Sequence, residues 1–205
     1  MSKHKSNRVY LLRHGRTVWN AEGKLQGRGD SPLLESSRPV IRQLANVIRP
    51  IHFDLFIRSP LQRVEESFTL MQPLNIVLDR IEPALMEISF GDYNGLRLKD
   101  VPADLLHRRE LDKWATPWPN GESYQDVFSR IQPVVQEIKH TAGTIGILAH
   151  ETVNKLLLAS LMGWSENRVF TLKHPNHVIY QIEDGNVSSR SVSAEWHRGI
   201  GYTEL

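Results

Sequence analysis

The sequence contains no cysteine among its 205 residues. Disulfide frameworks, thiolate metal sites and a cysteine nucleophile are therefore excluded. Long apolar runs are missing too, since no stretch approaches the roughly 20 apolar residues of a transmembrane helix. The basic segment Met1–Arg8 precedes only about four apolar residues, whereas a signal peptide needs roughly 7–15. We therefore expect a soluble, cytoplasmic protein.

A strong excess of charge of one sign is absent as well. The 25 basic and 23 acidic residues give a formal net charge of +2. This near balance gives no electrostatic reason to expect a nucleic-acid or membrane partner. A chain of this length can bury roughly 70% of its unfolded surface, so it needs neither disulfides nor a metal to fold. We expect a single domain over residues 1–205.

The stretch Val9–Thr17 joins an apolar run to a polar one. Its first four residues predict a short buried strand, and Arg13, His14 and Gly15 follow directly. Gly15 permits a sharp turn or a close backbone approach to a ligand. Because ligands bind at the carboxyl ends of strands in open α/β sheets, the pattern places Arg13 and His14 at a candidate site. The alternative is an ordinary turn with His14 on the surface.

Apolar runs and helical periodicities alternate along the rest of the chain. Strands are predicted at 54–58, 75–78, 144–149, 178–182 and 187–192, the last two joined by a turn at 184–186. Helices are predicted from Ser36 or Ser37 to Pro50, at 61–71, 105–114 and 123–142, and after His150. This alternation predicts an α/β protein with a largely parallel sheet.

Three local features complete these predictions. Ser59-Pro60 is expected to cap the helix at 61–71, with proline at its first position. Pro133 is expected to kink or divide the helix that contains it. The residues from Ala194 onward are expected to form an irregular tail.

Residues suited to phosphoryl chemistry follow several predicted elements. His14 and His150 each follow a strand, Arg13 adjoins the first of them, Arg63 opens a helix, and Glu87 precedes a glycine-containing loop. Arginine binds phosphate oxygens with a planar fork, and a neutral histidine can attack phosphorus. Apolar neighbours would raise the pKa of the Glu87 carboxyl and suit it to protonate a leaving oxygen. Solvent exposure of Arg63 and Glu87 is the alternative.

Five short motifs occur in order along the chain: 12–17 with 19–20, 59–63, 87–95, 121–123 and 149–151. Together they resemble the histidine phosphatase superfamily, in the branch that contains cofactor-dependent phosphoglycerate mutases and fructose-2,6-bisphosphatase. Residues 172–178 also resemble the late segment of fructose-2,6-bisphosphatase. The resemblance runs from Val9 to about Ile182. It implies a three-layer α/β/α sandwich with a mostly parallel central sheet.

The resemblance also implies a mechanism and a site. His14 would become a phosphohistidine that water later hydrolyses, and Glu87 would be the proton donor. Arg13, Arg63 and His150 would complete the catalytic pocket, and no metal or other cofactor would be required. The substrate, expected to be a small phosphorylated metabolite, would be bound by a further set of residues, namely Asn20, Gln26, Gly27, Glu151, His177, Arg109 and Lys113.

The last two of these come from a segment of basic character. Residues 96–122 include Arg108, Arg109 and Lys113 and are expected to form a lid or substrate wall, with the basic residues meeting a second anionic group. A solvated basic surface is the alternative. The oligomeric state is left open.

Some residues depart from the pattern of the superfamily. Arg16 replaces the usual acidic residue after the His-Gly pair, Glu151 stands where glycine is common, and Lys155 where arginine is common. An acidic group at position 151 would weaken anion binding unless it points away or pairs with Lys155 one helical turn later.

Three functions are compatible with these features. The first is a metal-independent phosphatase acting on a small phosphomonoester. The second is mutase-type phosphoryl transfer, although the chain is shorter than typical mutases of the family, with much of their insert between Glu87 and His150 expected to be missing. The third is a non-catalytic phosphate-binding or interaction protein on the same fold.

Overall fold

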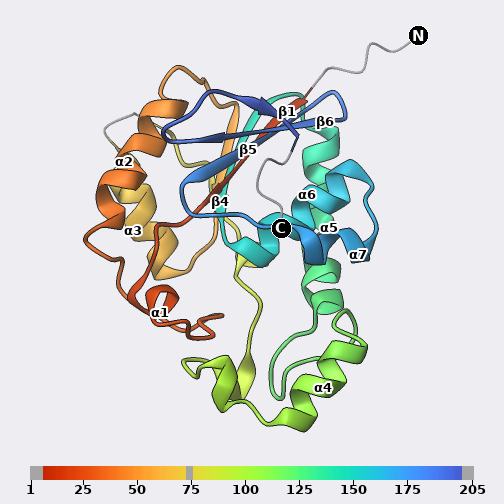
Figure 1. Cartoon of the computed structure of the whole chain (residues 1–205). Coiled ribbons are helices and arrows are strands. Elements are labelled where there is room, and N and C mark those ends of the chain that lie inside the picture. Colours follow the sequence, from red (N-terminus) through yellow and green to blue (C-terminus); the bar gives the residue numbers. More distant parts are fainter. Residues whose placement is uncertain (1–6, 73–75, 200–205) are drawn as a thin grey trace.

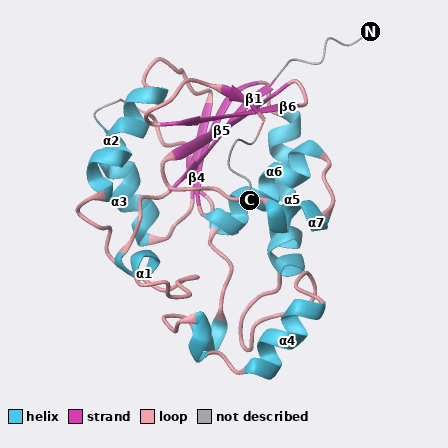
Figure 2. Cartoon of the chain, in the orientation of Figure 1, coloured by secondary structure: helices cyan, strands magenta, loops and turns pink. Residues whose placement is uncertain are grey.

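The computed structural model describes residues 7–72 and 76–199, and these residues form one seven-stranded sheet in the order β3-β2-β4-β1-β5-β6-β7 (Figures 1 and 2). The strands are β1 (Asn7–Arg13), β2 (Leu55–Arg58), β3 (Arg80–Ile81), β4 (Gly143–Ala149), β5 (Val178–Glu183), β6 (Asn186–Ser191) and β7 (His197–Arg198). Strands β3, β2, β4 and β1 are parallel to one another, whereas β5, β6 and β7 pair antiparallel. The α/β class is confirmed, and the sheet is mixed.

Helices cover both faces of the sheet, which gives three layers (Figure 1). Their bounds are α1 (Val18–Ala21), α2 (Ser37–Ile48), α3 (Gln62–Met71), α4 (Ala103–Leu111), α5 (Tyr124–His140), α6 (Glu151–Met162) and α7 (Glu166–Thr171), with short 3₁₀ turns at Pro83–Leu85, Gly91–Tyr93 and Leu98–Asp100. None of the helices in the described part of the chain has the length and apolar character needed to cross a membrane.

The alternation of side chains along β1 explains how the strand packs against the helical layer on each face of the sheet. Successive residues of a strand point to opposite faces. Val9 and Leu11 pack in the core cluster that contains α5 and α6, whereas Tyr10 and Leu12 pack with α2 and α3. Because both faces are covered, the middle of the strand, residues 9–12, is a continuous apolar run. This burial fixes the position of Arg13 and His14 at its end.

The helices predicted from Ser36 or Ser37 to Pro50 and at 123–142 are confirmed with small shifts. Ser123 and Asp126 form a reciprocal capping box at the start of α5, with N···O distances of 3.1 Å and 2.8 Å. Pro133 does not divide α5, which is assigned as one helix from Tyr124 to His140. Ile131 and Val135, which flank Pro133 in the sequence, are buried. Their packing offsets the free-energy cost of the backbone hydrogen bond that proline removes.

The strand predicted at 75–78 is wrong over the described residues 76–78, which are irregular; Asn75 lies outside the described residues. The edge strand is β3 instead, only two residues long and slightly later in the chain. Asp79 explains the shift, because its carboxylate accepts the N–H of Phe56 at 2.6 Å and its own N–H donates to the Phe56 carbonyl at 2.9 Å. The side chain thus takes a place that a strand backbone would fill, and ladder pairing begins at Arg80.

Two further predictions are corrected. Helix α3 begins at Gln62 and its N-cap is Leu61, so Ser59 does not cap it and Pro60 lies outside it. The expected irregular tail contains β7, which pairs with β6. The hairpin between β5 and β6 is confirmed, with positive φ at Asp184 (48°) and Gly185 (70°), as in a type I′ turn.

Candidate functional site

Two histidines meet at the carboxyl edge of the sheet because their strands are neighbours. Strands β1 and β4 are parallel and in register, with Arg13 opposite Ala149. His14 and His150 follow these two residues, so their rings come together with centroids 5.1 Å apart. Both side chains are buried. The predicted juxtaposition of His14 and His150 is therefore present.

The protonation state of His14 follows from its hydrogen bonds. Its Nδ1 lies 2.7 Å from the carbonyl of Gly15, which can only accept, so Nδ1 carries the hydrogen. Arg63 donates from Nε to Nε2 of His14 at 3.2 Å. Burial, and then the charges of Arg63 and Arg13, hold the pKa of His14 well below its usual value. The ring is neutral at pH 7, with its lone pair on Nε2.

Arg63 enters the site from the first turn of α3 and is almost fully buried. Besides His14 it donates to the carbonyls of Gly27 at 2.6 Å and Gly29 at 3.1 Å. No described carboxylate lies within 4.0 Å of its guanidinium, and burial lowers its pKa to about 10. A cation that is buried beside carbonyls is well placed to receive an anion.

His150 has one satisfied and one unsatisfied ring nitrogen. Its Nε2 lies 2.8 Å from the hydroxyl of Ser59, the residue that was predicted to cap α3. Among the described residues its buried Nδ1 has no hydrogen-bond partner. Burial, followed by Arg63 and His14, holds its pKa well below the usual value. An orphaned buried nitrogen beside a pocket indicates a ligand that completes its hydrogen bonding.

Glu87 is buried rather than turned to solvent, with 9% of its surface exposed. Its Oε1 accepts the N–H of Ile88 at 2.9 Å and its Oε2 accepts the N–H of Thr152 at 3.3 Å, at the start of α6. Two backbone N–H groups thus hold this carboxyl, which lines a pocket with Arg13 and Arg63 and not only with apolar side chains. The backbone donors fix its direction.

A cavity of about 160 Å³, here called the histidine pocket, brings most of the predicted site together. Its walls include the predicted residues Arg13, His14, Asn20, Gln26, Gly27, Arg63, Glu87 and Glu151. The remaining predicted residue of the catalytic set, His150, is fully buried and is not among the lining residues, but its ring lies next to that of His14.

Three of the predicted substrate-binding residues lie outside the histidine pocket. His177 lines a separate cavity of about 200 Å³ with Gly15 and Arg16. Arg109 and Lys113 line a third cavity, of about 520 Å³. Of the predicted substrate-binding set, these three residues are therefore the ones that do not line the histidine pocket.

Glu151 is held by Arg13, not by Lys155 as the helical spacing suggested. The Arg13 Nη1 donates to Oε2 of Glu151 at 2.7 Å and to the carbonyl of His174 at 2.8 Å. Burial lowers the pKa of Lys155 in spite of the attraction of Glu151. The Glu151 carboxylate is therefore already paired with the Arg13 guanidinium, a group that lines the histidine pocket.

Several supporting residues were missed by the sequence reasoning. Arg130 donates to the carbonyls of Met86 at 2.6 Å and Glu87 at 3.3 Å, and it pairs with Glu122 at 2.9 Å. Glu122 also accepts the N–H of Ser89 at 2.9 Å. This network fixes the chain on both sides of Glu87. Glu122 belongs to one of the quoted motifs, but Arg130 lies in a helix and nothing in its spacing indicated its partners.

A second set of residues that the sequence did not indicate holds the backbone next to and at His14. Asn176 donates to the His14 carbonyl at 2.6 Å. Asn154 donates to the carbonyl of Leu12 at 2.8 Å and lies 3.1 Å from Nδ1 of the buried His174. These contacts join residues that are more than 140 positions apart in the case of Asn154 and Leu12. Such partners cannot be recognised from local sequence patterns.

Gly27 is required by both conformation and space. Its φ is +49°, and a Cβ atom there would lie 2.5 Å from Oδ1 of Asn94 and 2.8 Å from the carbonyl oxygen of Ile88. Gly23 in the same loop has a φ of +68° but nothing within 4 Å. The two glycines therefore share the left-handed conformation and differ in crowding.

We expect Gly27→Ala to destabilise the protein by about 2 kcal/mol more than Gly23→Ala, because only the first adds a clash to the conformational cost. Urea unfolding of both variants measures the difference. Equal losses in the free energy of unfolding would contradict the assigned loop packing. Turnover of the two variants can be compared in the same way. It shows whether catalysis depends on the position of the Gly27 carbonyl, which accepts a hydrogen bond from Arg63.

The described residues, 7–72 and 76–199, contain no cluster of three or more histidine, aspartate or glutamate side chains arranged to hold a metal ion. The site is instead built from two arginines, two neutral histidines and a carboxylate. This set can bind an oxyanion, attack it through a ring nitrogen and exchange a proton with an adjacent oxygen.

Comparisons with known proteins agree with this chemistry. Rat 6-phosphofructo-2-kinase/fructose-2,6-bisphosphatase 3 is 27% identical over 178 residues, which cover 85% of this chain and 31% of the rat protein. The Caenorhabditis elegans 6-phosphofructo-2-kinase/fructose-2,6-bisphosphatase is 30% identical over 154 residues, covering 74% and 33%. The chain thus spans about a third of the length of these relatives.

Solved structures are similar over nearly the whole chain. A putative alpha-ribazole-5'-P phosphatase from Escherichia coli superposes with a TM-score of 0.78 at 24% identity, covering 90% of this chain and 94% of that one. Mycobacterial glucosyl-3-phosphoglycerate phosphatase, solved with VO3, gives 0.75 at 26% identity, covering 94% and 97%. The family model for the histidine phosphatase superfamily (branch 1) matches residues 9–195. The match takes in both strand-end histidines, and the chain belongs to branch 1 of the histidine phosphatase superfamily.

Proposed function

We propose that this protein is a metal-independent phosphatase that hydrolyses a small phosphomonoester through a phosphohistidine on His14. The observation that carries the proposal is the neutral His14 ring, whose Nε2 lone pair lies 3.2 Å from a buried arginine in a pocket shared with Glu87. Asn20, Gln26 and Gly27 lie on the walls of the same pocket and would position the phosphoryl group.

In the first step Nε2 of His14 attacks phosphorus and the bond from phosphorus to the ester oxygen breaks. Glu87, entering as the carboxylic acid, gives its proton to that oxygen, so the alcohol leaves neutral. Arg63 exchanges its contact with Nε2 for the phosphoryl oxygens, and Arg13 and His150 stabilise the developing charge. In the second step water attacks phosphorus, the N–P bond breaks, and Glu87 takes a proton from the water. Inorganic phosphate and free His14 result.

The test is phosphate release from a panel of small phosphomonoesters, with and without a chelator. Chelator-resistant release, together with a phosphoenzyme that survives alkali and is lost in acid, supports the proposal. Transfer of the phosphoryl group between positions of one sugar acid, without net release, would favour a mutase. Absence of both from folded protein would favour the non-catalytic phosphate-binding function.

We expect Glu151→Gln to lower the KM for phosphomonoesters about fivefold, because the substrate then no longer competes with a carboxylate for Arg13. Inhibition by inorganic phosphate should tighten by a similar factor. Glu166, an exposed residue in the first turn of α7, provides the matched control, and Glu166→Gln should leave KM unchanged. A higher KM in Glu151→Gln would mean that the pair orients Arg13 for the substrate.

A further inference from the structure

A largely apolar cavity adjoins the histidine pocket, and we call it the side pocket. It has a volume of about 520 Å³. Its apolar and aromatic walls are Leu25, Phe90, Leu98, Leu106, Trp118 and Tyr124. Its size lies within the range of roughly 300–1,000 Å³ that is usual for small-molecule sites. Most of the walls come from residues 96–122, the segment that was expected to act as a lid or substrate wall.

The side pocket shares part of its lining with the histidine pocket. Leu25 and Phe90 line both cavities. Tyr124, on the wall of the side pocket, is hydrogen-bonded to Thr152, which lines the histidine pocket. Burial raises the pKa of Tyr124 to about 12, and the charges of Glu87 and Glu151 add to this rise. A phosphate in the histidine pocket would therefore carry its ester group into the side pocket.

The two cations of the side pocket form part of its walls. The guanidinium of Arg109 lies 4.3 Å from the centre of the Trp118 ring and donates to the carbonyl of Thr116. The Lys113 ammonium lies 5.2 Å from the centre of the Phe170 ring and 5.8 Å from that of Tyr124. These are cation–π contacts, in which the cations cover aromatic faces.

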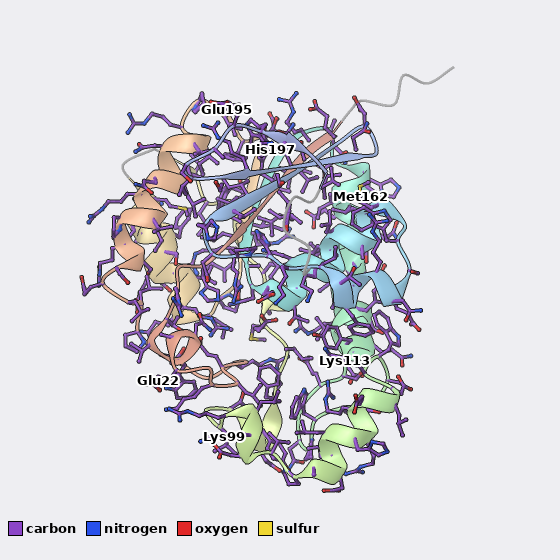
Figure 3. The ribbon with its side chains drawn as sticks, in the orientation of Figure 1. Glu22, Lys99, Lys113, Met162, Glu195 and His197 are labelled. Carbon is purple, nitrogen blue, oxygen red and sulfur yellow. The ribbon has the colours of Figure 1, made fainter. Side chains whose placement is uncertain are left out.

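The charge of the side pocket is also nearly balanced. The Glu110 carboxylate lines it together with the two cations. Arg108, which was expected to join them, is exposed and pairs with Asp104 at 3.4 Å. Figure 3 labels Lys113 in the part of the molecule that contains α4, where the side pocket lies. A second phosphate dianion would meet one carboxylate and two cations that already have partners, which is a poor site for it.

We propose that the substrate is the phosphate monoester of a bulky apolar or aromatic alcohol, which fills the side pocket and carries no second phosphate. The proposal rests on the proposed phosphatase function and specifies its substrate class. Burial of the alcohol against the aromatic walls then supplies binding energy that a small polar alcohol cannot supply.

The test compares esters whose alcohols differ in size and polarity but leave with similar ease. Naphthylmethyl phosphate, benzyl phosphate and glycerol phosphate are all esters of alkyl alcohols, and fructose 2,6-bisphosphate supplies the second phosphate. We expect kcat/KM for naphthylmethyl phosphate to exceed that for glycerol phosphate by about 30-fold, with benzyl phosphate between them. A flat profile, or a preference for the bisphosphate, would overturn the inference and leave the phosphatase function standing.

Leu98 and Leu111 provide a matched pair of variants. Both are exposed leucines of the segment 96–122, at 52% and 75%, but only Leu98 lines the side pocket. Leu98→Ser should lower kcat/KM for naphthylmethyl phosphate about fivefold relative to glycerol phosphate, whereas Leu111→Ser should leave the ratio unchanged. Equal ratios in the two variants would contradict the side-pocket proposal.

Binding of naphthylmethyl phosphonate, which cannot be hydrolysed, separates this inference from the function. If no ester is turned over but the phosphonate binds, and Leu98→Ser weakens the binding about fivefold, the side pocket stands and the phosphatase function falls. If neither turnover nor binding is found with folded protein, both proposals are overturned.

Discussion

Replacing His14 by alanine is expected to lower phosphate release by more than about 10⁴-fold, because no other described group in the histidine pocket can form the phosphoenzyme. His150 is nearby, but its Nε2 is hydrogen-bonded to Ser59 and it does not line the pocket. The measurement is turnover together with trapping of the alkali-stable phosphoenzyme. Both should disappear together.

A histidine outside the site provides the control. His140 is exposed at the end of α5, and His140→Ala should keep wild-type turnover. Because His14 is buried, the circular dichroism of the His14→Ala variant and its binding of inorganic phosphate must show that it is folded. A folded variant that still forms a phosphoenzyme would exclude His14 as the nucleophile.

The second large effect is expected for Glu87→Gln, and it should depend on the leaving group. An amide cannot give a proton to the departing oxygen, so turnover of alkyl phosphates should fall by about 10²–10⁴-fold. Nitrophenyl phosphate has a leaving group that departs as a stable anion, so its loss should be at least about tenfold smaller. Release from both substrates under saturating conditions gives the comparison.

An exposed glutamate provides the reference for this substitution. Glu35 pairs with Arg38 on the surface of α2, and Glu35→Gln should leave both rates unchanged. If Glu87→Gln reduced both substrates equally, the carboxylate would act in positioning Thr152 and α6, to which it is hydrogen-bonded, and not in transferring the proton. The leaving-group dependence therefore distinguishes a catalytic carboxyl from a structural one.

The two arginines of the histidine pocket differ in their partners. One guanidinium, on Arg63, is buried with carbonyl partners, whereas the other, on Arg13, is paired with Glu151. The proposed substrate must therefore compete for one of its two arginines. A substrate that gains binding energy from the apolar side pocket can tolerate this competition better than a small polar ester can.

The sequence by itself indicated the residues proposed to carry the chemistry and roughly where the main elements lie. Apolar runs long enough to be buried on both faces predicted β1 and β4, and the periodicity and capping residues predicted α2 and α5. Strand ends then placed His14 and His150 at one edge of the sheet. These inferences succeeded because each depends on residues within one element.

Tertiary structure decided everything that depends on contacts between distant segments. It set β4 between β1 and β2. It placed Ser59 in a hydrogen bond with His150 and not at the N-cap of α3. It paired Glu151 with Arg13 and not with Lys155. It moved His177 into another cavity. Each outcome is a competition between a local partner and one supplied by packing, and a sequence shows only the local partner. The side pocket has the same origin, because its walls come from segments that only the fold brings together.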